Sequence, residues 1–424
     1  MNIDELHRIF LRYPLACTDT RKIEANSIYF ALKGPNFNGN TFAAEALEKG
    51  AAYVVIDEEA YYIDDRTILV DDVLTTLQQL GTHHKNQCKA KVISLTGSNG
   101  KTTTKELINS VLSKKYKTIA TKGNLNNHIG VPLTLLTIKE DTEIAIIEMG
   151  ANHQGEIAFL SGLAQPDFGY ITNFGKAHLE GFGGVEGVLK GKSELYVHLM
   201  EHGKYIFLNA DDPIQKKKLS TYVKKYGFSQ TDHGYFVIKF LEANPFVTLS
   251  FENITINSKL IGNYNFTNCC AAVLMGKYFN VKKEDIKAAI ETYEPQNNRS
   301  QLINQNGFHI VLDAYNANPT SMVAALHSFK AMQSQNQTIV LGDMFELGVD
   351  ADKEHQNIAS LVDDLGFEDA YLVGEHFVRT TSKAKKFNDF DALATHLASN
   401  KLEQGTLLVK GSRGMAMERI LKLI

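Results

Sequence analysis

The sequence predicts an α/β protein of about three domains, and three observations support this. The chain has 424 residues, which at roughly 150 residues per domain suggests three units. Hydrophobic residues make up 44% of the chain, enough for each unit to bury a core. Short β-branched apolar runs alternate with segments of helical spacing, a pattern typical of mainly parallel sheets.

Composition narrows the class of protein. The formal net charge is −4, which argues against a nucleic-acid-binding protein, because such proteins usually carry a strongly basic face. Four cysteines show no CxxC spacing and indicate reduced thiols rather than a disulfide framework or a zinc site. The charged N-terminus does not resemble a signal peptide, and no run approaches ~18 apolar residues, so we expect a cytoplasmic protein without membrane insertion. The sequence does not determine the oligomeric state, and we expect a monomer.

The first domain is expected over residues 1–88. Strand-like runs occur at Ser27 to Leu32, Ala52 to Ile56 and Thr67 to Val70, with one helical stretch from Phe42 to Lys49. A polar stretch from His83 to Lys91 is expected to lead into the next domain.

The second domain is expected over residues 89–295. KVISLTGSNGKTTTKELINSVL reads as a strand, a glycine-rich turn and a helix. Further buried strands are expected at Ile144 to Glu148, Phe168 to Asn173 and Tyr205 to Asn209. Residues Pro245 to Ile261 alternate apolar and polar side chains, which predicts antiparallel strands attached to this domain.

The third domain is expected over residues 296–424, after the polar, turn-rich segment PQNNRS. Four apolar runs follow, each with a loop and a helical stretch after it, at His309 to Leu312, Thr338 to Leu341, Ala370 to Val373 and Thr406 to Val409. This alternation predicts a doubly wound, Rossmann-like domain.

The glycine-rich turn has the residues of a phosphate-binding loop. It lies between a predicted strand and a predicted helix, where backbone N–H groups and the helix N-terminus bind phosphate oxygens. Lys101 would neutralise phosphate charge and the Thr102 hydroxyl would bind Mg²⁺. The strict pattern needs glycine where Leu95 stands, so the loop is a shortened variant, and a simple helix-capping turn is the alternative. The expected nucleotide-binding residues here are Gly97, Ser98, Asn99, Gly100, Lys101, Thr102 and Thr103.

Two further polar residues follow predicted strands. Glu148 ends an apolar run, and a carboxylate at the carboxyl edge of a parallel sheet lies in the ligand crevice, where it could bind Mg²⁺. A helix cap or a surface acid is the alternative. His178 also follows a strand end and is a second candidate metal ligand, although a loop histidine is more often simply solvated.

Lys192 lies in a predicted helix, Val185 to Leu199, close to its apolar stripe. A lysine there is unusual. From spacing alone, the favoured interpretation is that its stem packs on apolar neighbours while the ammonium reaches water.

Strings along nearly the whole chain resemble the Mur ligase family of ATP-dependent amide-bond-forming enzymes. Any one string could occur by chance, but their order is specific. The strings are TDTR, FALKGPNFNGNTF, TGSNGKTTTKE, GNLNNHIGVPLTLL, EMGANHQGEI, ITNFGKAHLEGFG, KGKSELY, LNADDP, NYNFTN, NNRSQ, DAYNANPTSM, LGDMFELG and VKGSRG.

The resemblance implies a domain that holds the UDP end of a substrate, a central P-loop ATPase-like domain and a C-terminal domain that closes over ATP. It implies that Lys192 is carbamylated and binds magnesium together with Thr102, Glu148 and His178. Lys101, His178 and Lys192 would be catalytic. The remaining implied contacts are adenine to Asn265 and Asn268; phosphates and ribose to Arg299 and Asp313; the UDP-muramoyl substrate to Thr20, Arg21, Asn38, Asn124, Asn126 and Asn127; and the incoming dipeptide to Asn316, Asn318, Lys410, Ser412 and Arg413.

The implied activity joins D-Ala-D-Ala to UDP-N-acetylmuramoyl-tripeptide, with ATP and Mg²⁺, in peptidoglycan synthesis. The chain departs from the usual family pattern at Asn38-Gly39-Asn40, where relatives commonly show Asp-Gly-His, and at Ala25-Asn26, where they show Pro-Gly. These changes concern details of the uridine site. Two alternatives stay open: a ligase of the same family with a different acceptor, and a nucleotide-binding regulatory protein without ligase chemistry.

Overall fold

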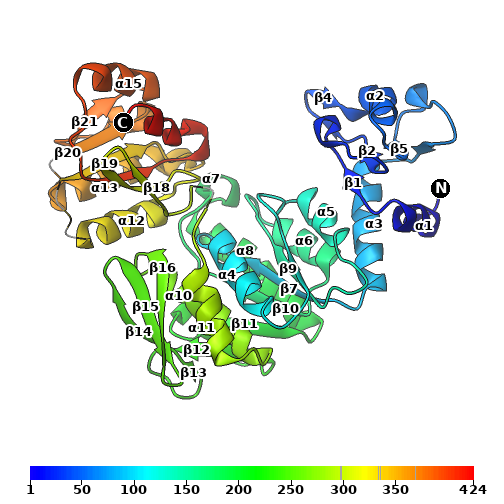
Figure 1. The fold of residues 1–424 in the computed structure, drawn as a ribbon, viewed down its shortest axis with the longest axis horizontal. Coiled ribbons are helices and arrows are strands. Elements are labelled where there is room, and N and C mark those ends of the chain that lie inside the picture. The colour runs from blue at the N-terminus through cyan, green and yellow to red at the C-terminus, as the bar shows by residue number, and fades with distance from the viewer. Residues whose placement is uncertain (297, 333, 335, 368) are drawn as a thin grey trace.

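The computed structural model describes residues 1–424 except 297, 333, 335 and 368. Asn297, within the expected boundary PQNNRS, lies outside the described residues. The fold is α/β with three units, as the sequence predicts. Figure 1 shows the N-terminal and C-terminal units standing on opposite sides above the central one. In the described part of the chain, no helix combines the length and apolar character that crossing a membrane requires.

The N-terminal unit holds a parallel sheet of order β1-β2-β5-β6 and a small β3-β4 hairpin. The three strand-like runs expected here form β2, β5 and β6, and the expected helix forms α2. The elements are α1 (Ile3–Arg12), β1 (Ala16–Cys17), β2 (Ile28–Phe30), β3 (Lys33–Gly34), β4 (Phe37–Asn38), α2 (Ala43–Glu48), β5 (Tyr53–Ile56), β6 (Thr67–Leu69) and α3 (Val73–Gln87).

The single helix expected in the N-terminal unit is wrong, because α1 and α3 are also present. Residues 83–87, expected within a linking stretch, form the last turn of α3. Asp72 caps this helix by accepting a hydrogen bond from the Thr75 N–H at 2.6 Å. Val73, Leu77 and Leu80 form its buried stripe, and His84 continues that stripe as a buried polar residue. Val73, Leu77 and Leu80 have helical spacing in the sequence, and only the polar last turn, with His84, departs from an apolar stripe.

The central unit has seven parallel strands in the order β13-β12-β11-β10-β7-β9-β8. Its elements are β7 (Lys91–Thr96), α4 (Lys101–Leu112), β8 (Thr118–Ala120), α5 (Gly130–Leu135), β9 (Ile144–Glu148), α6 (Glu156–Ala164), β10 (Phe168–Ile171), α7 (Leu179–Phe182), α8 (Val185–Glu201), β11 (Tyr205–Asn209), α9 (Pro213–Lys218), β12 (Lys225–Ser229) and β13 (Phe236–Val237).

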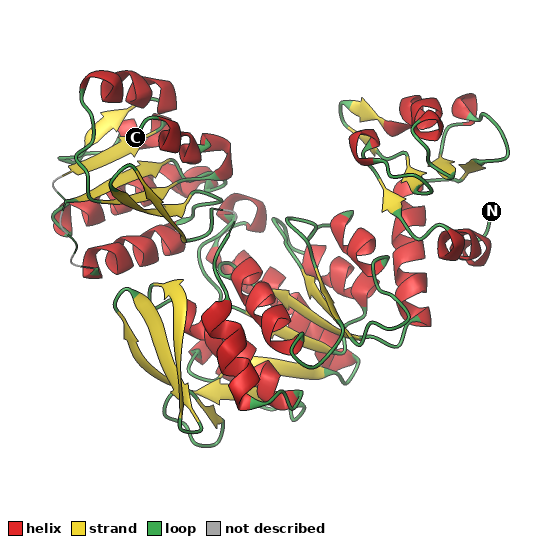
Figure 2. Cartoon of the chain, in the orientation of Figure 1, coloured by secondary structure: helices red, strands yellow, loops and turns green. Residues whose placement is uncertain are grey.

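A second, antiparallel sheet of order β14-β15-β16 is attached to the central unit, as the alternating pattern predicts. Figure 2 shows it as a separate group of strands at the lower left. Helix α10 packs between it and α4, and eleven of its residues are buried. The elements are β14 (Lys239–Ala243), β15 (Phe246–Phe251), β16 (Ile254–Ile261), α10 (Asn265–Tyr278) and α11 (Lys283–Thr292).

The C-terminal unit has the sheet order β17-β18-β22-β19-β20-β21, in which only the edge strand β17 is antiparallel. The four expected strands form β18, β19, β20 and β22, whereas the short edge strands β17 and β21 were not foreseen. The elements are β17 (Gln301–Gln305), β18 (Phe308–Asp313), α12 (Pro319–Ala331), β19 (Gln337–Gly342), α13 (Ala351–Asp364), β20 (Asp369–Val373), α14 (Glu375–Val378), β21 (Lys385–Phe387), α15 (Phe390–Ser399) and β22 (Thr406–Lys410).

Candidate nucleotide and ligase site

The sheet order of the central unit places the candidate residues at one edge. After β7 the chain forms β8 and β9 on one side of β7, and then β10 on the other. The loops that follow β7, β9 and β10 therefore meet at the point where the strand order reverses, which is where open α/β sheets bind ligands. A cavity of about 690 Å³ opens there, and residues of the C-terminal unit form its other wall.

Two glycines allow the loop after β7 to take its shape. Gly97 has φ +142° and Gly100 has φ +76°, both in the region that side chains disfavour. A Cβ at Gly97 would lie 1.9 Å from the Thr172 Oγ1, and one at Gly100 would lie 2.7 Å from the Asn268 Oδ1. Gly100 is the N-cap of the 12-residue helix α4, so the loop leads directly into a helix N-terminus. This is the geometry expected of a phosphate-binding loop.

Lys101 begins α4 and folds back onto the loop. Its Nζ donates hydrogen bonds to the carbonyl oxygens of Gly97 at 2.8 Å and Ser98 at 3.3 Å. Burial lowers the pKa of Lys101 from its usual value, while the nearby Glu148 carboxylate raises it. An anionic phosphate beside this amine would favour its charged form.

Glu148 ends β9 and is buried, with 1% of its surface exposed. Its carboxylate accepts hydrogen bonds from the Thr102 hydroxyl at 2.9 Å and from the Asn126 Nδ2 at 2.8 Å. Neither the helix cap nor the surface acid considered from the sequence fits this burial. The arrangement places a carboxylate and a hydroxyl, both hard oxygen donors, next to each other at the cavity wall.

His178 lies in the loop after β10 and adopts a left-handed backbone with φ 53°. Its Nδ1 is 2.5 Å from the Glu346 Oε2 of the C-terminal unit. This contact with His178 lowers the pKa of Glu346. The histidine side chain is largely covered rather than solvated, so it is part of the contact between two units.

Lys192 differs from the interpretation based on spacing. The residue is completely buried in α8, and its Nζ donates a hydrogen bond to the Ala151 carbonyl at 3.0 Å. The amine lies 4.8 Å from the centre of the Phe182 ring. Burial, and secondarily the charge of Lys101, lowers the pKa of Lys192 well below the usual lysine value. The amine therefore does not reach water. The interpretation from spacing, in which the ammonium reaches water, is wrong.

Within the described ranges, no three His, Cys, Asp or Glu side chains gather as a metal-binding group. The expected magnesium set mixes other donors: the Thr102 hydroxyl, the Glu148 carboxylate, the His178 imidazole and Lys192. Thr102 and Glu148 fit a magnesium ion by donor type, whereas Lys192 fits only as a carbamate, because an amine offers no anionic oxygen. His178 now faces Glu346.

The side chains expected near adenine and ribose are engaged with one another. Asn268 donates from Nδ2 to the Asn265 Oδ1 at 2.7 Å and accepts from the Thr104 hydroxyl at 3.0 Å. Asp313, at the end of β18, accepts a hydrogen bond from the Lys410 Nζ at 2.6 Å. The Arg299 guanidinium stacks on the Tyr315 ring, 3.6 Å from its centre.

The residues expected at the peptide substrates are partly used as local caps. Asn127 accepts hydrogen bonds from two N–H groups at the start of α5. Asn318 caps α12 with its Oδ1 and donates from Nδ2 to the Asn99 Oδ1 at 2.7 Å, which joins the C-terminal unit to the phosphate loop. Ser412 accepts a hydrogen bond from the Phe345 N–H at 2.8 Å. Arg413 pairs with Glu418 at 3.1 Å.

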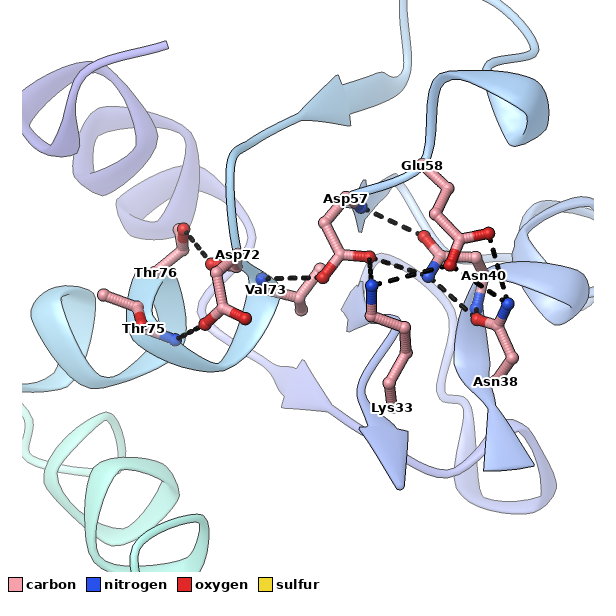
Figure 3. A network of polar contacts seen from close by, with 9 residues as sticks. All are labelled: Lys33, Asn38, Asn40, Asp57, Glu58, Asp72, Val73, Thr75 and Thr76. Carbon is pink, nitrogen blue, oxygen red and sulfur yellow. Dashed lines mark hydrogen bonds and ion pairs between the residues drawn. The ribbon is translucent and has the colours of Figure 1, made fainter. Parts of the chain in front are cut away.

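Thr20, Arg21 and Asn38 lie apart from the cavity, in the N-terminal unit. Arg21 makes a two-point pair with Asp19, which lowers the pKa of Asp19 to about 2. Figure 3 shows Asn38 in a polar network centred on Asp57. There, Asn38 donates to Glu58 and accepts from the Asn40 amide at 2.9 Å. Asn40, one of the departures from the family pattern, also donates to Asp57 at 2.9 Å.

Most predicted residues of the central and C-terminal units come together around the cavity. Gly97 and Lys192 are buried and do not line the cavity. Asn124 lines the cavity and is exposed. Sequence reasoning missed further lining residues, which fall within the quoted strings except for Ala324. They are Gly150, Ala151, Asn152, Glu156, Asn173, Tyr264, Ser300, Tyr315, Thr320, Ser321, Ala324, Phe345, Glu346 and Gly414.

The fold and the cavity define a nucleotide-phosphate-binding protein of the P-loop type with a second α/β unit over its phosphate loop. The family model of the Mur ligase middle domain matches residues 95–276, and that of the Mur ligase glutamate ligase domain matches residues 298–413. The chain belongs to the Mur ligase family.

Relatives match almost end to end. The UDP-N-acetylmuramoyl-tripeptide–D-alanyl-D-alanine ligase of Bacillus subtilis (strain 168) is 35% identical, covering 96% of this chain and 92% of its own length. The enzyme of that name from Escherichia coli (strain K12) is 34% identical with the same coverage. The crystal structure of MurF ligase from Thermotoga maritima in complex with ADP has a TM-score of 0.85 at 25% identity, covering 97% of both chains. A MurF structure from Acinetobacter baumannii has a TM-score of 0.84 at 30% identity, covering 96% of this chain and 92% of that chain.

Proposed function

We propose that this chain is an ATP-dependent ligase that adds D-Ala-D-Ala to UDP-N-acetylmuramoyl-tripeptide in the cytoplasm, during synthesis of the peptidoglycan precursor. The observation that carries the proposal is the cavity between the phosphate loop and the C-terminal unit. The relatives of that name, similar along 96% of the chain, support this choice of reaction. We further propose that residues 1–88, 89–295 and 296–424 are the working units of a monomer.

ATP is proposed to bind with its phosphates on the loop from Gly97 to Thr103. Backbone N–H groups at the start of α4 and the Lys101 ammonium would hold the phosphates. Both groups carry positive charge, which attracts the phosphate oxygens. The similar structure from Thermotoga maritima is a complex with ADP, which supports nucleotide binding by this chain. Asn265 and Asn268 are proposed to lie beside the adenine, with Arg299 and Asp313 near the phosphates and ribose.

Magnesium is proposed to bind at Thr102, Glu148, His178 and a carbamylated Lys192. Bound there, it would neutralise phosphate charge as phosphate is transferred. The buried Glu148 carboxylate, with its two hydrogen bonds, would keep a fixed orientation toward the cavity. The lowered pKa of Lys192 favours the uncharged amine, which is the form that reacts with carbon dioxide.

The proposed reaction solves the poor reactivity of a carboxylate. A carboxylate oxygen of the tripeptide attacks the γ-phosphorus of ATP, and ADP leaves as an acyl phosphate forms. The free amine of D-Ala-D-Ala then attacks the acyl carbon, phosphate leaves, and the amine gives up a proton. Lys101 would stabilise the transferring charge, and the C-terminal unit would exclude water while the acyl phosphate exists.

The substrates are proposed to reach the cavity from two sides. Thr20, Arg21 and Asn38 would hold the UDP end in the N-terminal unit, while Asn124, Asn126 and Asn127 would hold the muramoyl peptide. The dipeptide would bind at Asn316, Asn318, Lys410, Ser412 and Arg413. Of these, Lys410 is buried and already paired with Asp313, so we expect it to act by orienting that carboxylate.

The test is phosphate release by the purified protein with ATP, Mg²⁺ and D-Ala-D-Ala. The assay is run with two UDP-tripeptides. One ends in lysine, and the other ends in a diamino acid different from lysine. Product formation confirmed by mass supports the proposal. Activity with free amino acids but none with D-Ala-D-Ala would instead indicate a family member with a different acceptor.

A further inference from the structure

The loop that carries His178 is held from outside its own unit. We define the His178 loop as residues 175–180, which follow β10 and include the first two residues of α7. The Lys176 N–H donates to the Thr320 hydroxyl at 2.9 Å, and the Lys176 Nζ contacts the Glu354 carboxylate at 2.5 Å. The Glu180 N–H donates to the Glu346 carbonyl at 3.2 Å. Three segments of the C-terminal unit thus contact Lys176, His178 and Glu180 of this loop.

The backbone of this contact is strained on both sides. His178 has φ 53° and Glu346 has φ 62°, in the left-handed region that non-glycine residues rarely adopt. Such conformations persist where surrounding contacts impose them. The His178 loop therefore depends on the C-terminal unit for its shape.

The C-terminal side of the contact is itself well braced. His355 accepts a hydrogen bond from the Met344 N–H at 3.0 Å, and Asp343 accepts from two N–H groups at the start of α14. His355 directly follows Glu354 on α13, so the same helix that supports the 343–348 loop also carries the partner of Lys176. These hydrogen bonds hold the 343–348 loop in place, so it can fix the position of the His178 loop that it contacts.

In the described part of the chain, the Glu354 carboxylate also accepts a hydrogen bond from the Asn357 Nδ2 at 3.5 Å, on its own helix. The Glu354 side chain is only 7% exposed, and neither residue lines the cavity. A buried carboxylate without its partner is strongly unfavourable, so the pair holds the two units together. Because the pair does not reach the cavity, its most direct route to the reaction is the His178 loop, which carries Lys176.

We propose that Glu354 is a positioning residue that, through Lys176, fixes the loop presenting His178 to the phosphate cavity. Docking of the C-terminal unit thereby completes the site as well as covering it. The expected effect on turnover rests on the proposed function. The expected effect on the conformation of the His178 loop does not.

The first test is a double-mutant cycle of Lys176→Met, Glu354→Gln and the double variant. Each single variant should lower kcat roughly 10–100-fold, the scale expected when a reacting group is misplaced by about 1 Å. The double variant should be no worse than the poorer single one, and the KM for the UDP-substrate should stay unchanged. Lys385→Met is the matched control, because it breaks the 3.2 Å pair with Asp369 far from the loop. Its kcat should equal that of the parent, and unchanged kcat in Glu354→Gln would overturn the proposal.

The second test is hydrogen exchange on the substrate-free protein. In Glu354→Gln, exchange should accelerate several-fold over residues 175–182 while β19 and β22 keep the parental rate. Unchanged exchange in the loop would overturn the proposal, and so would faster exchange throughout the C-terminal sheet, which would show a merely structural role. If the parent protein had no ligase activity, the proposed function would fail while this measurement still decided how the loop is held.

Discussion

Lys192→Met is expected to raise the free energy of unfolding and to abolish turnover. The buried Lys192 amine donates one recorded hydrogen bond, to the Ala151 carbonyl at 3.0 Å. Methionine fills similar space and removes a desolvated polar group that costs about 1–3 kcal/mol, while it loses a hydrogen bond worth about 1 kcal/mol. Against the uncharged amine, methionine is therefore expected to gain about 0–2 kcal/mol. Near pH 7 the cost of deprotonating Lys192 in the folded state adds to this gain.

The gain should depend on pH with a definite sign. Burial lowers the pKa of Lys192 in the folded state, so the unfolded chain binds more protons at this group. The stability of the parent protein therefore rises with pH, by at most about 1.4 kcal/mol per pH unit between the lowered pKa and the usual lysine value. Methionine does not titrate, so its advantage should be smaller at pH 9 than at pH 7.

The assay is urea unfolding at pH 7 and pH 9 in bicarbonate-free buffer, together with phosphate release by the same samples. Lys190→Met, an exposed position on the same helix, is the control and should change neither quantity. Labelling with ¹³C-bicarbonate should give a carbamate signal in the parent that Lys192→Met lacks. Full turnover by Lys192→Met, or an equal stability difference at both pH values, would refute the reasoning.

Three other measurements follow from the site and the core. Lys101→Ala should lower turnover roughly 10²–10³-fold or more at saturating ATP, with Lys114→Ala as an exposed control, and parental turnover would disprove the phosphate-loop role. D-Ala-D-Ala should exceed D-Ala in kcat/KM by roughly 10²–10⁴-fold, since about two buried polar groups would stay unpaired with the shorter acceptor, and equal values would reject this acceptor. Burial and the neighbouring His84 lower the pKa of His7 to about 4, so stability should fall as pH drops from about 6.5 toward 4. His7→Leu should flatten that fall by about 1–2 kcal/mol in urea unfolding, the exposed His233→Leu should not, and parallel curves for all three proteins would contradict the assignment.

The parallel strands and the phosphate loop were predictable because each depends on local sequence. A β-branched run followed by glycines and a helical stripe specifies the β7 to α4 unit without tertiary information. Glu148 was found for a similar reason, since a strand end fixes its edge of the sheet. The family strings then supplied most of the cavity wall.

Features that depend on contacts between distant segments were not predictable in this way. The sequence predicts a polar linking stretch where the last turn of α3 lies, because the buried stripe ends in His84, whose ring meets His7 of α1 at 3.0 Å. The burial of Lys192 depends on Ala151 and Phe182, neither adjacent in sequence. The contact between His178 and Glu346 spans two units, and no periodicity within either segment indicates it.

Helix α3 gives the molecule a fixed internal length. It packs against α1 in the N-terminal unit and against α5 and α6 in the central one, and Figure 1 shows it running from one unit into the other. Its 15 residues span about 22 Å, and β7 begins four residues after its end and leads straight to the phosphate loop. A helix packed on both units, rather than a flexible linker, thus connects the N-terminal unit to the phosphate loop. The length of α3 therefore sets the distance between the N-terminal unit and the phosphate loop. An extended ligand that contacts both must span that distance.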